Sequence, residues 1–133
     1  MKKINIGILG FGTVGGGTYD ILTKNKDLIE KRTGRSYEIK KILVRSPERL
    51  KNHGVSTDIA TTSPEDIIEN DNIDLVVVGP EAPLCEGIVD LFKESNIKVF
   101  GADKKSARLE GSKDFAKEFM KKYEVPTAKY ETI

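Results

Sequence analysis

Three spaced glycines directly follow the first apolar run of this chain. Residues 10–15 come after the run Ile4 to Leu9. In a strand–turn–helix unit, the first glycine permits the tight turn, the second lets the backbone approach a pyrophosphate, and the third lets the helix pack against the strand. The helix N-terminus then offers free N–H groups to the anion. The spacing predicts a nucleotide-binding βαβ unit, and the alternative is a turn without a ligand. The candidate cofactor-binding residues are Gly10, Phe11, Gly12, Thr13, Val14 and Gly15.

Length and composition limit the classes of protein to which the chain can belong. At 133 residues it fits a single domain. Its 22 Lys and Arg nearly balance 21 Asp and Glu, so neither nucleic acid nor a membrane surface is an expected partner. Apolar runs stay far below the roughly 20 residues of a spanning helix. One cysteine fits a reducing compartment, and we therefore predict a cytoplasmic protein.

Apolar runs alternate with helical periodicity along the chain, which predicts parallel strands joined by crossover helices. The expected strands cover residues 4–9, 37–44, 58–61, 75–78 and 99–100. The resulting fold class is α/β, a Rossmann-like doubly wound parallel sheet of order 3-2-1-4-5, in one three-layer domain over residues 1–133. A ligand crevice is expected at the carboxyl ends of strands one and four.

Helical periodicity places the crossover segments. We expect one helix from the glycine turn to about residue 32, one that opens at residues 63–66 and breaks at residues 70–72, one over residues 84–92, and one from about residue 113. The last helix carries Phe115, Phe119 and Tyr123 at spacings of four, a stripe that we assign to the core. Residues 126–133 are expected to be extended and able to add an edge strand.

From Met1 to about Val78 the chain resembles the nucleotide-binding half of homoserine dehydrogenase. The matching segments are residues 7–15, 39–45, 61–62 and 73–78. The resemblance implies NAD(P) binding, with phosphate contacts around Phe11, Thr13 and Val14.

From Ile73 onward the chain instead resembles the N-terminal region of glycinamide ribonucleotide synthetase (phosphoribosylamine–glycine ligase). The matching segments are residues 78–84, 98–101, 109–113 and 125–128. The first family should leave strand four into a Glu-containing, glycine-rich turn, and the second should begin with Gly-Gly-Arg-Glu-His; neither is present. The pattern predicts a chimera of two Rossmann-like halves, residues 1–76 and 77–133, whose joint lies in a strand that suits both. The sequence leaves open whether the joint is natural or engineered.

Arg45 directly follows the second strand, where NAD-specific folds often carry an acid for the ribose 2′-hydroxyl. An arginine there, beside Ser46, suits a 2′-phosphate through charge-assisted bonds. Arg45 is therefore a candidate cofactor-binding residue that would prefer NADP to NAD. The alternative is an arginine that faces solvent at a strand end.

Two further candidates depend on the resemblances. Glu81 lies in the loop that lines the phosphoribosylamine site of the synthetase, which makes it a candidate substrate-binding residue; the alternative is a structural turn. Lys104 follows Gly-Ala-Asp, where homoserine dehydrogenases carry Thr-Ala-Asn before a lysine near the nicotinamide. It is a secondary cofactor-binding candidate. His53 and Cys85 have no neighbours with metal-ligand or catalytic spacing, so we predict neither a metal site nor a catalytic residue.

Neither family's chemistry is complete in this chain. Homoserine dehydrogenase needs a second domain that carries its catalytic lysine, and the synthetase needs its ATP-grasp domain. We expect residual binding of NADP or NAD at most, no binding of ATP without the ATP-grasp domain, and no turnover. Two alternatives stay open: an ATP- or phosphoribosyl-binding ligase fragment, and a folded chimera without a ligand. Apolar surface exposed by the missing domain would permit self-association.

Overall fold

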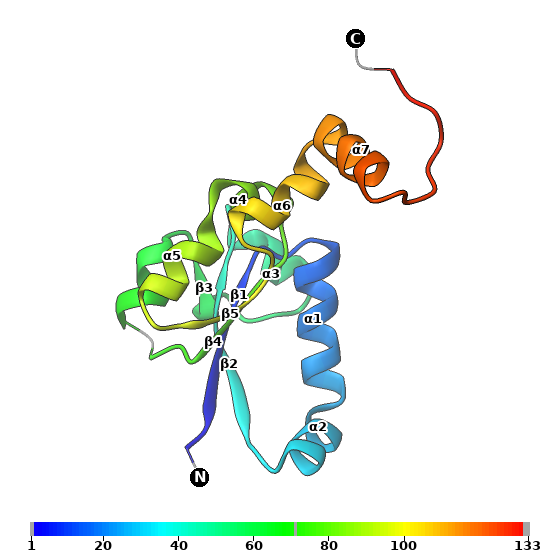
Figure 1. Cartoon of the computed structure of the whole chain (residues 1–133). Coiled ribbons are helices and arrows are strands. Elements are labelled where there is room, and N and C mark those ends of the chain that lie inside the picture. The colour runs from blue at the N-terminus through cyan, green and yellow to red at the C-terminus, as the bar shows by residue number, and fades with distance from the viewer. Residues whose placement is uncertain (1, 71, 132–133) are drawn as a thin grey trace.

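The computed structural model describes residues 2–70 and 72–131, so part of the predicted helix break at residues 70–72 and the end of the predicted extended segment lie outside it. Figure 1 shows a central twisted sheet with helices around it. The five strands are all parallel and run in the order β3-β2-β1-β4-β5, which confirms the predicted fold class and strand order. The strands are β1 (Ile4–Leu9), β2 (Tyr37–Leu43), β3 (Ala60–Thr61), β4 (Leu75–Val78) and β5 (Lys98–Phe100).

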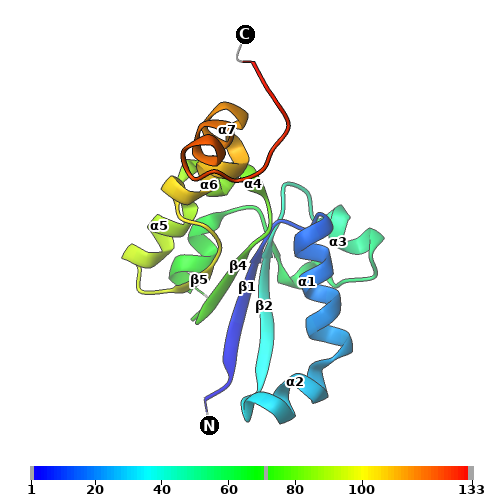
Figure 2. The same ribbon diagram turned by 45° about the vertical axis from the view of Figure 1, so that its right-hand side comes forward.

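Helices cover both faces of the sheet, and two buried clusters fill the space between the layers (Figure 2). On one face lie α1 (Thr13–Lys24), α2 (Lys26–Thr33) and α3 (Glu48–Asn52). On the other lie α4 (Glu81–Glu86), α5 (Ile88–Glu94), α6 (Lys104–Gly111) and a single π-helical turn (Asp66–Asn70). A 3₁₀ turn (Thr57–Ile59) leads into β3. The crossover from β3 to β4 therefore changes the face on which the helices pack.

The apolar strand of the predicted joint, β4, lies inside the sheet and pairs with the central strand, β1. Ile6 pairs with Leu75 and Leu9 with Val78, so the two strands end together. Val76 is fully buried, as the all-apolar sequence of this strand predicts. The carboxyl ends of β1 and β4 meet at one edge, where the glycine turn begins.

Asp74 fastens the opposite, amino-terminal ends of the same two strands. Its carboxylate accepts hydrogen bonds from the Asn5 backbone N–H and from Lys2 Nζ, both at 2.9 Å. Its own N–H donates to the Asn5 carbonyl oxygen at 2.9 Å. The Asn5 N–H and then Lys2 stabilise the charged form, which holds the pKa of Asp74 below its usual range.

Two helices that the sequence predicts as continuous are broken in the structure. The first ends at Lys24 and restarts at Lys26, because Asn25 leaves helical geometry and its side chain donates to the Ile21 carbonyl oxygen. The fourth crossover breaks at Gly87, whose φ of +94° lies in the left-handed region that favours glycine. Apolar spacing alone does not reveal either break.

The C-terminal helices differ most from the prediction. Sequence periodicity misses α6, although Asp103 accepts a hydrogen bond from the Ser106 N–H in the usual manner of an N-terminal cap. The stripe on α7 (Lys113–Lys122) is not core, since no residue of that helix is buried. Both views place α7 beyond the end of the sheet, joined to the body through α6 (Figures 1 and 2). Residues 125–131 are extended but form no strand in the part of the chain that the structure describes.

Candidate functional site

A cavity of about 660 Å³ lies at the carboxyl ends of β1 to β4. Each of these strands contributes its following loop, so the cavity sits where the strand order reverses, the usual ligand site of an open α/β sheet. Its lining residues are Leu9 to Gly15 from the first loop, Leu43 to Ser46 with Arg49 from the second, Thr62 and Pro64 from the third, and Gly79, Pro80, Ala82 and Pro83 from the fourth. The cavity therefore includes the predicted crevice at the ends of strands one and four, and the loops after β2 and β3 line it as well.

The three glycines of the turn have different surroundings. Gly10 has a φ of +82°, and a Cβ there would lie 2.5 Å from Pro80 Cγ. A Cβ on Gly15 would lie 2.0 Å from the Gly10 carbonyl oxygen, so only glycine lets α1 approach the turn this closely. A Cβ on Gly12 would meet nothing within 4 Å. The first and third glycines are needed by the fold itself, whereas the second borders open space.

The open space beside Gly12 adjoins the N-terminus of α1. The Gly16 N–H donates to the Gly12 carbonyl oxygen at 2.8 Å and so begins the helical hydrogen bonds. The N–H groups that precede it have no helical carbonyl within reach, and no acidic residue occupies the first turn. Free N–H groups, the positive end of a helix dipole and room for an anion therefore coincide.

The loop after β4 closes the other side of the cavity. The Gly79 N–H donates to the Leu9 carbonyl oxygen at 3.0 Å, and a Cβ on Gly79 would lie 3.1 Å from Gly15 N. Pro80 then packs over Gly10. The loop that resembles one family thus packs closely on the glycine turn that resembles the other.

A positively charged corner borders the cavity after β2. Arg45 and Ser46 line it as the sequence predicts, and Arg49 joins them one turn later, on α3. All three side chains are exposed, so their donors can reach a ligand. The Ser46 hydroxyl donates to the Glu48 carboxylate, and this bond lowers the pKa of Glu48. Sequence reasoning missed Arg49; its position four residues after Arg45, across Pro47 at the start of a helix, was the available signal.

Phe11 lies in the turn, but its ring belongs to the core. The side chain is buried and packs edge-on against Tyr19 at 5.6 Å and His53 at 5.4 Å between ring centroids. The ring therefore fixes the turn against α1 and the end of α3. His53, which the sequence left without a role, contributes to that support.

Glu81 and Lys104 lie outside the cavity lining. Glu81 opens α4, and its Oε1 lies 3.7 Å from the place that a Cβ on Gly111 would take. Lys104 opens α6; its N–H donates to Asp90 at 3.1 Å, and its side chain packs over Gly87. The cavity thus unites the glycine turn with Arg45, and the structure separates these two predicted residues from it.

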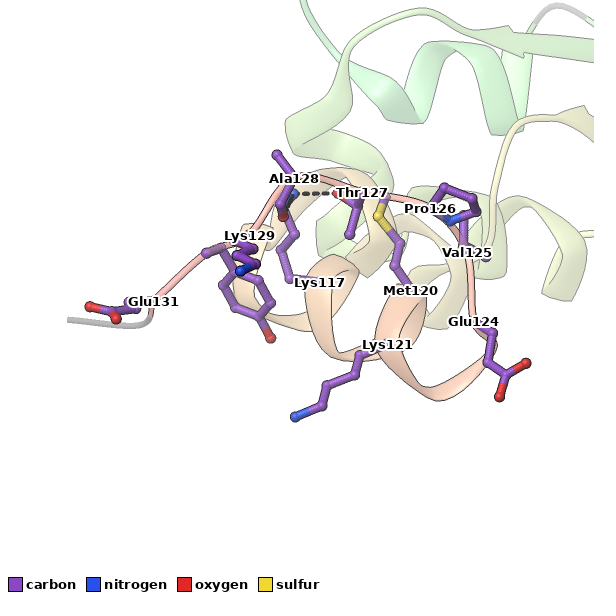
Figure 3. A pocket seen from close by; sticks show the side chains of 11 residues that line it. Lys117, Met120, Lys121, Glu124, Val125, Pro126, Thr127, Ala128, Lys129 and Glu131 are labelled. Atoms are coloured by element: carbon purple, nitrogen blue, oxygen red, sulfur yellow. Dashed lines mark hydrogen bonds between the residues drawn. The ribbon is translucent and has the colours of Figure 1, made fainter.

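A second hollow, of about 920 Å³, lies between α7 and the extended tail after it (Figure 3). Lys117 extends to Thr127, to which its Nζ donates, and it also reaches the Ala128 carbonyl oxygen at 3.4 Å. Lys121 points away from the tail in the same view. Its lining residues come from α7 and from residues 124–131, so this hollow lies apart from the carboxyl ends of the strands (Figure 1).

Three further results concern the described residues. Among them, no three His, Cys, Asp or Glu side chains lie close enough together to hold a metal ion. No helix there has the length and apolar character needed to cross a membrane. Cys85 is half-buried on α4, where its Sγ lies 3.6 Å from the Ala107 carbonyl oxygen.

Solved structures with a similar fold include homoserine dehydrogenases. One from Thiobacillus denitrificans is 32% identical, with a TM-score of 0.66 over 92% of this chain and 28% of that protein. One from S. aureus is 28% identical, with a TM-score of 0.65 over 88% of this chain and 31% of that protein. The WlbA dehydrogenase from Bordetella pertussis, solved with NADH and UDP-GlcNAcA, is 18% identical at a TM-score of 0.56, which shows the fold alone.

Curated relatives are phosphoribosylamine–glycine ligases. The Clostridium acetobutylicum protein is 61% identical over 69 residues, which make up 50% of this chain and 17% of that protein. The Ralstonia nicotianae protein is 41% identical over 114 residues, 75% of this chain and 27% of that protein. The chain therefore spans about a quarter or less of the length of these relatives.

The two sets of relatives confirm both resemblances drawn from the sequence. A family model, "Phosphoribosylglycinamide synthetase, N domain", matches residues 27–110. This match begins before the predicted joint, in α2, and includes β2 through most of α6. It covers well over half of the 133 residues. The chain belongs to the phosphoribosylglycinamide synthetase N-domain family.

Proposed function

We propose that this domain binds a phosphate-bearing nucleotide in the cavity at the carboxyl ends of β1 to β4, and that it prefers NADP to NAD. The observation that carries the proposal is the open space beside Gly12, at the N-terminus of α1 and inside the cavity that Arg45 and Arg49 border. By itself the domain binds without catalysing a reaction, because the proposed role uses only positioning groups.

The glycine turn supports a pyrophosphate in this cavity. A diphosphate needs N–H donors and close approach of the backbone, and the turn offers both beside Gly12. If a side chain from the loop after β4 filled that space, the cavity would not accommodate a diphosphate. Pro80 instead packs over Gly10 and leaves Gly12 clear.

The charged corner supports a second phosphate. Arg45 and Arg49 bring two guanidinium groups to one side of the cavity, and no acidic side chain is among its lining residues. Guanidinium groups bind phosphate through paired, charge-assisted hydrogen bonds. A phosphate on the adenosine ribose would occupy this corner while the diphosphate lies at the glycine turn.

Calorimetric titration with NADPH and NADH tests the proposal. We expect Gly12→Ala to weaken NADPH binding by about tenfold or more, because the methyl group occupies the space intended for phosphate, and tenfold corresponds to about 1.4 kcal/mol. The variant should fold normally, since nothing lies within 4 Å of the new Cβ.

Gly17→Ala is the matched control for that variant. Gly17 lies on α1, the helix that Gly12 caps; it also has nothing within 4 Å of an added Cβ, but it does not line the cavity. It should leave NADPH binding unchanged and stabilise α1 slightly. Failure of wild-type protein to bind NADPH at millimolar concentration would overturn the proposal, as would equal affinities of the two variants.

Family membership favours a second candidate, a ribose phosphate or ATP. The curated relatives are named as ligases of phosphoribosylamine, and the same glycine turn and arginines could hold a single phosphate. Thermal-shift measurements with ribose 5-phosphate, ATP and NADPH separate the candidates. A rise in melting temperature with ribose 5-phosphate or ATP, but not with NADPH, would favour this candidate. The absence of a shift with all three would favour a folded domain without a ligand.

The origin of the chain as a joined pair of Rossmann-like halves also remains our proposal. High identity to the ligases is concentrated in stretches of 69 to 79 residues, whereas similarity to homoserine dehydrogenases extends over most of the chain. The shared apolar β4 provides a joint at which burial and register survive. Comparison of residues 1–74 and 79–133, each alone, with both families tests it: two halves that match the same family throughout would overturn the proposal.

A further inference from the structure

The sequence Ser-Pro-Glu occurs twice, each time two or three residues after the end of a strand that borders the cavity. Ser46 to Glu48 follows β2, and Ser63 to Glu65 follows β3. In both, the serine hydroxyl donates to the glutamate carboxylate two residues later. That bond is the main cause of the lowered pKa of each glutamate. The two segments thus share one local structure, which makes one a natural control for the other.

The two segments differ in what the serine faces. Ser46 lines the cavity between Arg45 and Arg49, whereas Ser63 is not a lining residue. A serine hydroxyl has a single proton to donate. As long as Glu48 accepts it, Ser46 cannot donate to a phosphate in the charged corner. Glu48 is not a lining residue itself, but its carboxylate accepts from Ser46, which is one, so it brings a negative charge to the edge of the charged corner.

We propose that Glu48 determines how strongly this site prefers a 2′-phosphorylated nucleotide to one with a free 2′-hydroxyl. It holds the Ser46 hydroxyl away from a bound phosphate, and its charge opposes that of the phosphate. A free ribose hydroxyl has the opposite requirement, because it can itself donate to a carboxylate. Glu48 therefore reduces the difference in binding affinity between NADPH and NADH that Arg45 and Arg49 create. This inference rests on the proposed function.

Titration of NADPH and NADH into Glu48→Ala protein tests the inference. We expect the ratio of the two affinities to rise about three- to tenfold in favour of NADPH, the range typical of the net contribution of one ordinary hydrogen bond. Glu48→Gln removes the charge but keeps an acceptor for Ser46, so it should give a smaller rise. The matched control, Glu65→Ala, should leave the ratio unchanged. Melting temperatures of all three variants show whether they fold.

The double variant Ser46→Ala, Glu48→Ala tests the route through Ser46. If Glu48 acts by holding that hydroxyl, Glu48→Ala should raise the ratio less in the Ser46→Ala background than in wild-type protein. An unchanged ratio in folded Glu48→Ala protein that still binds NADPH, or an equal rise in Glu65→Ala, would overturn the inference alone. Wild-type protein that binds neither cofactor would instead overturn the proposed function, and the inference with it.

Discussion

The apolar stripe of α4 and α5 and the apolar stripe of α7 have similar helical spacing, but only the first is buried. Val89 and Phe92 are fully buried against the sheet. Phe119 on α7 is 38% exposed, and Tyr123, directly after that helix, is 57% exposed. The first stripe packs in one buried cluster with Val76 and Val78 of β4 and lies beside β5, whereas α7 extends past the sheet and meets α6 and its own tail (Figure 1). Periodicity therefore predicts that a helix is amphipathic, but not that the chain supplies a surface for its apolar side.

The largest effect on stability is expected when the buried stripe is truncated. Phe92→Ala removes a fully buried ring from the centre of its cluster. We expect a loss of about 3–5 kcal/mol in the free energy of unfolding, because the transfer and cavity terms add. Urea denaturation followed by circular dichroism measures it. A loss below about 1 kcal/mol would mean that α5 does not pack on β4 as described.

An intermediate effect on stability is expected at Asp74, whose carboxylate joins the amino-terminal ends of β1 and β4. Asp74→Asn removes the carboxylate that accepts from the Asn5 N–H and Lys2. We expect a loss of about 1–2 kcal/mol at neutral pH, since hydrogen bonds to charged groups exceed neutral ones. Lys2→Ala, which removes the exposed partner alone, should cost less than about 1 kcal/mol.

The effect of Asp74→Asn should depend on pH in one direction. Because the folded state lowers the pKa of Asp74, the carboxylate stabilises the protein above its unfolded-state pKa, and this contribution is lost as the pH falls through the folded-state value. Wild-type and variant stabilities should begin to converge as the pH falls below about 4, and they should become similar only below the lowered folded-state pKa of Asp74. A difference that persists unchanged at pH 2 would contradict this origin.

The smallest effect on stability is expected when the exposed stripe of α7 is truncated. Phe119→Ala truncates the exposed stripe, so we expect a loss of less than about 1 kcal/mol, several times less than that from Phe92→Ala. The same denaturation experiment provides the measurement. If the protein self-associates through α7, the loss should grow with protein concentration. A large loss at low concentration would show that α7 has a core after all.

In the candidate site, too, some features follow from short segments of the sequence and others depend on tertiary packing. The glycine turn, Arg45 and the crevice follow from short segments and from the strand order that alternating apolar runs imply. The structure places Arg49 at the cavity and Glu81 and Lys104 outside its lining, and the sequence does not predict these positions, because they depend on where α3, α4 and α6 begin and on what packs beside them. The breaks at Asn25 and Gly87 likewise arise from local backbone geometry that apolar spacing does not report.

The parallel sheet, its strand order and the glycine turn at residues 10–15 follow from the amino-acid sequence alone, because each depends on residue types at fixed short spacings. Tertiary structure alone decided which apolar stripes are buried and which loops enclose the cavity. It also decided that Pro80 leaves the space beside Gly12 open. The physical reason is that burial and enclosure depend on surfaces supplied by distant parts of the chain, whereas turns and strands depend mainly on neighbouring residues.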